Sequence, residues 1–411
     1  MRRWFSVALV VLGLVAALAM PFGSTAVAKS TKTATCRTSP NRAGETKKLI
    51  RIGNSADISG PIPGLYTGAQ LATKAYAAYF NASGKRICGR KIAVDAFDSA
   101  TSAGADQKSY AQICAKDFAA VGSMSDDDLG GASVTQHCHL PDLRARSTSA
   151  ARNACSTCFG VEATTTNEWL NSVPDYFVQH DGAAAQKAAM LYINDPATKA
   201  AALTEMKAAQ KRGFTYLYSS AIDFAEFNYV PYVEQMKSKN VEIVQFIGSF
   251  QQQVRLAEAM QQVGFHPAVY LLDSAAYTPS FAAEGGTSVD GVIVYTDFLP
   301  LSTDQTELNL YKKWLARTSP GAKPTPDGLY AWSAMKLFTT EAVSLGKNLT
   351  RASLVKRVRT VKAWTGGGLH TPMAVGPKQL SGCARFLQVS NGSWVSYAGT
   401  AYRCSGVTKV S

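Results

Sequence analysis

The order of strand and helix patterns along this chain limits its fold more than any other feature. After an N-terminal leader, an apolar strand pattern at Leu49–Asn54 is followed by an amphipathic helix pattern at Tyr66–Phe80, and the alternation continues toward the C-terminus. Alternating strands and helices are typical of parallel sheets with helices on both faces. We therefore predict an α/β protein of two doubly wound, Rossmann-like lobes. Such lobes are suited to closing on a small molecule.

Residues 1–28 have the pattern of a secretory signal peptide. Arg2 and Arg3 provide positive charge, Val7 to Met20 is apolar, and Ala26-Val27-Ala28 is a small-residue cleavage site. The apolar run is only slightly shorter than a membrane-spanning helix, so a retained anchor is the alternative. No cysteine lies near the cleavage site, so a bacterial lipoprotein signal is absent. We expect a secreted or extracytoplasmic protein, in a periplasm or cell envelope.

The eight cysteines all follow this leader. An even number of cysteines in an oxidising compartment indicates disulfides. We expect Cys383–Cys404 because these residues flank a final hairpin whose turn is Asn391-Gly392. We expect Cys114–Cys138 because these residues end consecutive helices. Cys36 and Cys88 both precede parallel strands, so we pair them, which leaves Cys155–Cys158.

The Cys155-Ser156-Thr157-Cys158 segment has two other interpretations. A redox motif of this spacing should open a helix after a strand in a thioredoxin-like setting. Half of a zinc site would need a second pair of ligands, which His137-Cys138-His139 could supply. Structural zinc sites usually have tighter ligand spacing in both halves, so we predict no metal site.

The formal net charge of the chain is +13. The basic residues are spread out, apart from short clusters such as Lys356-Arg357-Val358-Arg359. Nucleic-acid binding requires a basic stripe with interleaved aromatic residues, and none is present in the sequence. A basic surface favours an anionic envelope, so the protein is predicted to be peripheral to a membrane at most.

Catalytic motifs are missing from the sequence. There is no G-x-S-x-G, P-loop, G-x-G-x-x-G after a strand, or H-E-x-x-H, and the five histidines are scattered. Pairs of catalytic carboxylates leave no such motif. We predict a binding protein rather than an enzyme, with no cofactor.

Several segments resemble one known family. They are Ile52-Gly53-Asn54-Ser55-Ala56-Asp57-Ile58-Ser59-Gly60-Pro61 with Tyr66-Thr67-Gly68-Ala69, then Gly89-Arg90-Lys91-Ile92, Ala120-Val121-Gly122-Ser123, the helix at 227–239, Gly291-Val292 and Tyr330-Ala331-Trp332. In order and spacing they are similar to the type I periplasmic binding proteins. The group concerned is the branched-chain amino acid (leucine/isoleucine/valine-binding) substrate-binding proteins of ABC transporters.

This resemblance implies a domain organisation and a mechanism. Residues 29–48 would be a flexible lead-in, 49–163 with 297–367 one lobe, and 164–296 with 368–411 the other. Crossovers near 160–166, 294–300 and 366–372 would serve as hinges, and closure would present a bound amino-acid-like or other small amphipathic ligand to an ABC-transporter permease. The alternative is a ligand-sensing lobe that serves a separate signalling partner.

The resemblance also implies where the ligand binds. The loop after the first strand, Ser59–Tyr66, and the loop after the third strand, at Ser123 and Asp126, would contact it. An ionised Asp126 would repel a ligand carboxylate, and the alternative is that 126–128 cap the next helix. Arg146-Ser147-Thr148-Ser149 offers hydroxyls and N–H groups. The expected ligand-binding residues are Tyr66, Ser123, Asp126, Ser147, Thr148, Phe250 and Asp273, with Ser274 beside the last as an alternative.

Overall fold

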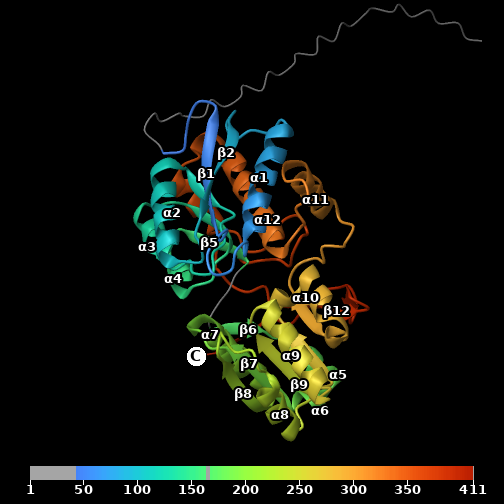
Figure 1. Ribbon diagram of the computed structural model, residues 1–411. Coiled ribbons are helices and arrows are strands. Elements are labelled where there is room, and N and C mark those ends of the chain that lie inside the picture. The colour runs from blue at the N-terminus through green and yellow to red at the C-terminus, as the bar shows by residue number, and fades with distance from the viewer. Residues whose placement is uncertain (1–42, 163–166, 411) are drawn as a thin grey trace, which may run out of the picture. The chain divides into compact units, whose positions relative to one another are not determined.

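The computed structural model describes residues 43–162 and 167–410, apart from the side chain of Ala197 (Figure 1). The expected signal peptide at residues 1–28 and Cys36 lie outside the described residues. Within 43–162 and 167–410, no helix has the length and hydrophobicity needed to cross a bilayer.

The first sheet is built from the N-terminal part of the chain. Its strand order is β2-β1-β3-β4-β5, and every neighbouring pair is parallel. The strands are β1 (Leu49–Ala56), β2 (Lys91–Asp98), β3 (Ala119–Val121), β4 (Asp142–Arg146) and β5 (Cys158–Glu162). The helices around it are α1 (Thr67–Ala82), α2 (Ala103–Lys116), α3 (Gly130–His137), α4 (Ala150–Ala154), α11 (Thr306–Thr318), α12 (Pro326–Leu345) and α13 (Arg351–Val358).

Helices cover both faces of this sheet. In Figure 1, α2 and α3 lie on one side of the strands, and α1 and α12 lie on the other. The aromatic stripe of α12 is part of the core, as the sequence indicated, because Trp332 is fully buried against Tyr76 of α1 at 4.8 Å between ring centroids. The first sheet is therefore enclosed, as a parallel sheet requires.

The second sheet contains the middle of the chain and its C-terminal strands. Its strand order is β13-β12-β11-β10-β9-β7-β8, and β14 pairs with β12. The strands are β7 (Ala188–Ile193), β8 (Tyr216–Ile222), β9 (Ile243–Ile247), β10 (Val269–Leu272), β11 (Ile293–Thr296), β12 (Cys383–Ser390), β13 (Ser393–Tyr397) and β14 (Arg403–Cys404). The α-helices of this part are α5 (Ser172–His180), α6 (Gly182–Ala185), α7 (Pro196–Gln210), α8 (Val230–Ser238), α9 (Phe250–Val263) and α10 (Pro279–Gly285).

Short elements complete the chain. They are the 3₁₀ helices η1 (Ser274–Ala276), η2 (Gly286–Val289) and η3 (Gly346–Asn348), and the antiparallel pair β6 (Glu168–Leu170) and β15 (Val407–Lys409). The pairing of β6 with β15 joins segments far apart in the sequence. Neither this pair nor helix α13, which contains the first part of the basic cluster at 356–359, was expected from the sequence.

The C-terminal hairpin has the predicted turn. Ser390 pairs with Ser393, so Asn391-Gly392 forms the two-residue connection between β12 and β13, and both residues have positive φ. The structure contains the disulfides Cys383–Cys404, Cys114–Cys138 and Cys155–Cys158, which are three of the expected pairs. Cys88 is also disulfide-bonded.

Two of the expected crossovers run side by side. After β11, the backbone N–H of Leu299 donates to Leu369 O at 2.8 Å, and the N–H of Thr371 donates to Asp297 O at 2.8 Å. Gly366, Gly367 and Gly368 precede this pairing and all have positive φ, a conformation that costs other residues more. The remaining crossover follows Glu162, and 163–166 lie outside the described residues.

Candidate functional site

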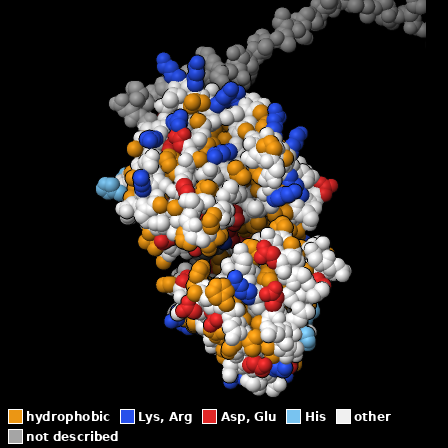
Figure 2. Space-filling model, in the orientation of Figure 1, with side chains coloured by type: hydrophobic (Ala, Val, Ile, Leu, Met, Phe, Trp, Pro, Cys, Tyr) orange, Lys and Arg blue, Asp and Glu red, His pale blue; other side chains and the backbone are white. Residues whose placement is uncertain are grey.

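Two adjoining cavities lie at the carboxyl ends of strands from both sheets. Arg146 ends β4 and Glu162 ends β5, whereas Asp273 and Asp297 directly follow β10 and β11. Ligands of open α/β sheets bind at this edge. The surface in Figure 2 is hollowed where the elements of the two sheets meet. These cavities are therefore the candidate site.

The first, here called the acidic cavity, has a volume of about 220 Å³. Its polar and aromatic lining is Arg146, Glu162, Glu168, Trp169, Thr204, Glu205, Asp273, Ser274, Tyr295, Thr296 and Asp297. The second, here called the aromatic cavity, has a volume of about 370 Å³ and shares Arg146, Glu162 and Ser274 with the first. Its large apolar and aromatic lining is Ile62, Leu65, Tyr66, Phe250, Tyr277, Phe298 and Tyr330.

Arg146 lies where the cavities meet. Its Nη2 donates to Tyr66 Oη at 2.9 Å, and its Nη1 lies 3.8 Å from Glu162 Oε2. Its Nε is buried and has no hydrogen-bond partner among the described residues. Arg146 is also the only cation among the described residues that line the two cavities. Its guanidinium is therefore outnumbered by the carboxyl groups that line the two cavities.

The carboxylates near Arg146 hold their protons more tightly than usual. Burial raises the pKa of Glu162 to about 8, and the nearby charges of Asp297, Asp327 and Asp273 add to this effect while Arg146 opposes it. Burial likewise raises the pKa of Asp327 to about 6, again against the attraction of Arg146. Acids whose environments shift their pKa this far in a cleft are typical of functional sites.

Glu205 and Asp273 belong to the part of the chain that forms the second sheet. Burial raises the pKa of Glu205 to about 8, with a further contribution from Asp273, although Tyr295 Oη donates to Glu205 Oε1 at 3.1 Å. Burial also raises the pKa of Asp273, although that carboxylate accepts the N–H of Ala275 at 3.1 Å. Asp273 thus begins helix η1 and faces the acidic cavity at the same time.

The aromatic cavity is shaped by the loop after β1 and by the start of α9. Ser249 caps α9 in a capping box with Gln252, which places half-buried Phe250 at the first helical position. Tyr330 donates a hydrogen bond to Asp297, which links the aromatic wall to an acid of the neighbouring cavity. This cavity therefore combines apolar walls with a few polar groups, as ligand sites commonly do.

The structure brings together part of the expected ligand set. Tyr66 and Phe250 line the aromatic cavity and Asp273 lines the acidic one, with Ser274 lining both. Asp126 lies next to Tyr66, whose Oη is 3.4 Å from Asp126 Oδ1.

The expected hydroxyls lie elsewhere. Ser123 is fully buried and its Oγ accepts the N–H of Ser55 at 3.1 Å. Ser147 is 2 % exposed, and Thr148 Oγ1 donates to Ser125 O at 3.0 Å. None of these three residues lines either cavity.

The alternative interpretation of 126–128 as caps of the next helix is wrong. Helix α3 begins after Leu129, whose side chain makes no capping hydrogen bond. Asp127 instead accepts the N–H of Ala103 at the start of α2, and Asp128 accepts the N–H groups of Thr148 and Ser149. These acids therefore fix the loops after β3 and β4.

The sequence interpretation did not assign Glu162, Glu205, Asp297, Asp327 or Arg146 to the ligand. The sequence does contain a signal for Glu162 and Asp297 as ligand-binding candidates, because each lies at or just after the end of an apolar strand pattern. Arg146 was noted only as the first residue of a hydroxyl-bearing loop. Glu205 has no such signal, since it lies within helix α7.

Comparison with known proteins agrees with this geometry. The model of the family described as periplasmic binding protein matches residues 49–393. No curated protein sequence shows significant similarity to the chain.

Solved structures of similar fold cover most of the chain. A fatty acid ABC transporter substrate-binding protein from Thermomonospora curvata has 18% identity and a TM-score of 0.73, over 87% of this chain and 94% of its own. A branched-chain amino acid ABC transporter from Thermus thermophilus with bound valine has 14% identity and a TM-score of 0.73, over 88% of this chain and 98% of its own. A branched-chain amino acid transporter substrate-binding protein from Streptococcus pneumoniae in complex with isoleucine has 13% identity and a TM-score of 0.71, over 88% of this chain and 100% of its own.

At these identities the solved structures establish the fold, and the family model covers most of the sequence. The chain therefore belongs to the periplasmic binding protein family and has its type I fold.

Proposed function

We propose that this protein is an extracytoplasmic solute-binding protein. It binds a small amphipathic or amino-acid-like ligand in the acidic and aromatic cavities and delivers that ligand to an ABC-transporter permease. The observation that carries the proposal is that both cavities lie at strand ends and are lined by residues from both sheets, such as Glu162 and Asp273. Binding, closure and release need no catalytic step.

The site offers separate surfaces for the polar and apolar parts of a ligand. Arg146 has an N–H with no partner among the described residues and the acidic cavity has several carboxyl groups, whereas Phe250 and Tyr277 line the neighbouring cavity. The solved relatives include proteins described as binding valine and isoleucine and as a fatty acid transporter component. Ligands of this size and amphipathic character fit the proposed role.

The crossovers between the two sheets act as the hinges about which the lobes close. The segments after β11 and before β12 are paired by the backbone hydrogen bonds of Leu299 and Thr371, so they bend together. Closure about such hinges buries a ligand between two lobes and creates a surface that a permease can distinguish from the open form. We place residues 49–163 with 297–367 in one lobe and 164–296 with 368–411 in the other.

A thermal-shift screen tests this function. A ligand present at 100 times its dissociation constant should stabilise the folded protein by about 2.7 kcal/mol. Amino acids, amides, aromatic acids and small amines are screened against the mature protein, and hits are titrated by calorimetry. A saturable one-to-one hit supports solute binding. Failure of small solutes of every charge class to bind would count against it.

A further inference from the structure

We infer that the ligand of this site carries net positive charge: an amphipathic organic amine whose ammonium group lies in the acidic cavity and whose apolar part lies in the aromatic cavity. This inference rests on the proposed solute-binding function and specifies the class of solute. The fold determines where the ligand binds, and the charged side chains that line the cavities determine which class of solute binds there.

The acidic cavity has more carboxyl groups than cations among the described residues that line it. Its lining includes the carboxylates of Glu162, Glu205, Asp273 and Asp297, and Arg146 is its only cation among the described residues. Buried carboxylates in folded proteins are normally paired with cations or coordinate metals. In a cavity of about 220 Å³ an anionic ligand would be repelled by the acids that are ionised, whereas a protonated amine would be attracted to them and would favour ionisation of Glu162 and Glu205, whose pKa values are raised to about 8.

The acidic cavity suits an organic cation better than a metal ion. Among the described residues, no group of three or more histidine, cysteine or acidic side chains is arranged to hold a metal ion. The carboxylates therefore surround the cavity without converging on one point. An ammonium group, which donates up to three hydrogen bonds to spaced acceptors, suits this arrangement better than a metal ion does.

Aromatic side chains line both cavities. Trp169 and Tyr295 line the acidic cavity and contact each other edge to face, with 6.0 Å between their ring centroids. Aromatic faces attract organic cations, and this attraction strengthens as water is excluded. Phe250 and Tyr277 then receive the apolar part of the ligand across Arg146, Glu162 and Ser274, which the two cavities share.

A site for a net cation differs in its balance of charge from a site for a zwitterionic amino acid. A plain α-amino acid brings one positive and one negative group, so it would leave the excess of carboxylates over Arg146 unchanged. A net cation lowers that excess. Burial raises the pKa of both Glu162 and Glu205 to about 8, so their ionisation and the binding of a cation beside them favour each other.

The experiment uses ligands with matched carbon skeletons. Leucine, leucinamide and 4-methylpentanoate give a zwitterion, a cation and an anion of one shape, and phenylalanine, phenylalaninamide and 3-phenylpropanoate give a second set. Calorimetric titration of the mature protein should show that an amide cation binds at least about 10-fold more tightly than its zwitterion, with no measurable binding of the anion.

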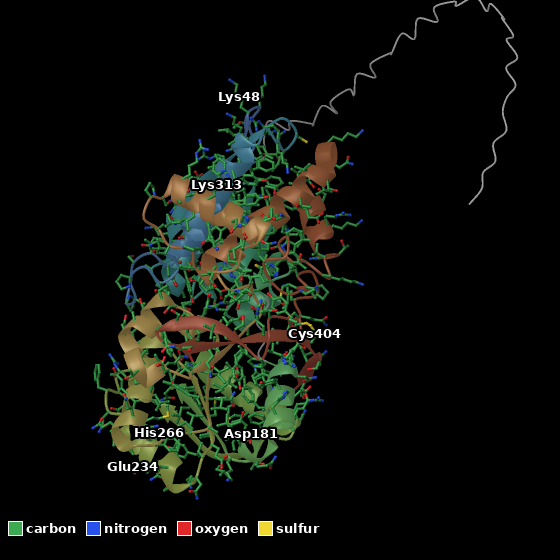
Figure 3. All side chains as sticks on the ribbon, turned by 90° about the vertical axis from the view of Figure 1, so that its right-hand side faces the viewer. Lys48, Asp181, Glu234, His266, Lys313 and Cys404 are labelled. Atoms are coloured by element: carbon green, nitrogen blue, oxygen red, sulfur yellow. A yellow bond between two sulfur atoms is a disulfide. The ribbon has the colours of Figure 1, made fainter. Side chains whose placement is uncertain are left out.

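Two variants and one control locate the cation. Glu205→Gln and Asp273→Asn keep the shape of each side chain but leave it unable to ionise, and each should weaken binding of the amide cation about 10- to 150-fold. Glu234→Gln is the control, because Glu234 is an exposed residue of α8 that points outward near the lower edge of Figure 3. It should bind the cation as the parent protein does.

The outcomes are distinct. Equal or tighter binding of a zwitterion or anion overturns the cation inference but leaves solute binding intact. Tight cation binding that neither Glu205→Gln nor Asp273→Asn weakens also overturns it, because the ammonium would then lie elsewhere. Absence of binding by all six compounds counts against both the inference and the solute-binding function.

Discussion

Tyr66 and Arg146 are joined by a hydrogen bond that connects the loop after β1 to the end of β4. Arg146 Nη2 donates to Tyr66 Oη at 2.9 Å, and the guanidinium carbon lies 5.8 Å from the centre of the tyrosine ring. Tyr66 is only 6 % exposed, so it fixes the position of Arg146, which borders both cavities.

Replacing Arg146 by Gln should destabilise the protein more at pH 8 than at pH 6. Arg146 lowers the pKa of Glu162, Asp273, Asp297 and Asp327 relative to burial alone. Without it their folded-state pKa values rise further, so ionisation at higher pH costs more. We expect a loss of about 1–3 kcal/mol at pH 8, measured by urea denaturation.

Tyr66→Phe is the matched comparison, because it removes the hydroxyl contact but keeps the guanidinium. Its loss should be smaller and nearly independent of pH between 6 and 8. Losses of equal size at the two pH values for Arg146→Gln would show that its charge does not matter to these carboxylates.

The raised pKa of Glu205 predicts that the stability of the protein falls as the pH rises. Its ordinary pKa is 4.5 and burial raises the folded value to about 8. Between these values the folded protein holds a proton that the unfolded chain has lost, so rising pH lowers stability. Glu205→Gln removes this dependence, and its unfolding free energy should improve relative to the parent as pH rises from 6.5 to 8.

His370 is present both in the parent protein and in the Glu205→Gln variant, so its titration affects the stability of both. Burial lowers the pKa of His370 to about 4, which makes stability increase with pH below the ordinary value of 6.5. Since this contribution cancels in the difference, a flat difference between Glu205→Gln and the parent above pH 6.5 would refute the raised pKa of Glu205.

The sequence predicted those features that depend on local chemistry or on strand order. The turn at Asn391-Gly392 follows from two residues that tolerate positive φ, and Asp273 follows from its position after an apolar strand. Glu205 could not be found in this way, because the direction of a side chain within α7 depends on how that helix packs. The hydroxyls of Ser123 and Thr148 look available to a ligand in the sequence. In the structure, Ser123 Oγ accepts the N–H of Ser55 and Thr148 Oγ1 donates to Ser125 O.

Breaking the buried ion pair between helices α2 and α4 should lower the stability of the protein. Arg152 Nη2 lies 2.6 Å from Asp106 Oδ2, and both side chains are fully buried. Removal of Asp106 leaves Arg152 with Asp142 at 3.2 Å and leaves the N–H of Gly131 without its acceptor, and breaking a buried pair costs about 3–5 kcal/mol. We expect this loss for Asp106→Ala in chemical denaturation.

Asp175→Ala is the control for that measurement, because Asp175 pairs with Arg212 at 2.6 Å on the surface, where both side chains are partly exposed. Exposed pairs contribute about 0–1 kcal/mol. Similar losses for the two variants would contradict the structural role assigned to Asp106.

The C-terminal disulfide should stabilise the second sheet. Cys383 and Cys404 are separated by 21 residues in the sequence and pair across β12 and β14. A cross-link closing a loop of this length contributes about 3 kcal/mol in the chain-entropy model. Replacing both cysteines by Ala should lower the stability by about that amount. Replacing both Cys155 and Cys158, which close a much shorter loop, should cost less.

Small-angle X-ray scattering tests the central claim most directly. The mature protein is measured alone and at saturation with the compound that binds it most tightly in the titrations, with the Asp273→Asn variant under the same conditions as the control. We predict that the radius of gyration of the parent falls on binding, because the two lobes close on the ligand. A saturable ligand that leaves the radius of gyration unchanged would contradict the account of a binding protein that closes on its solute.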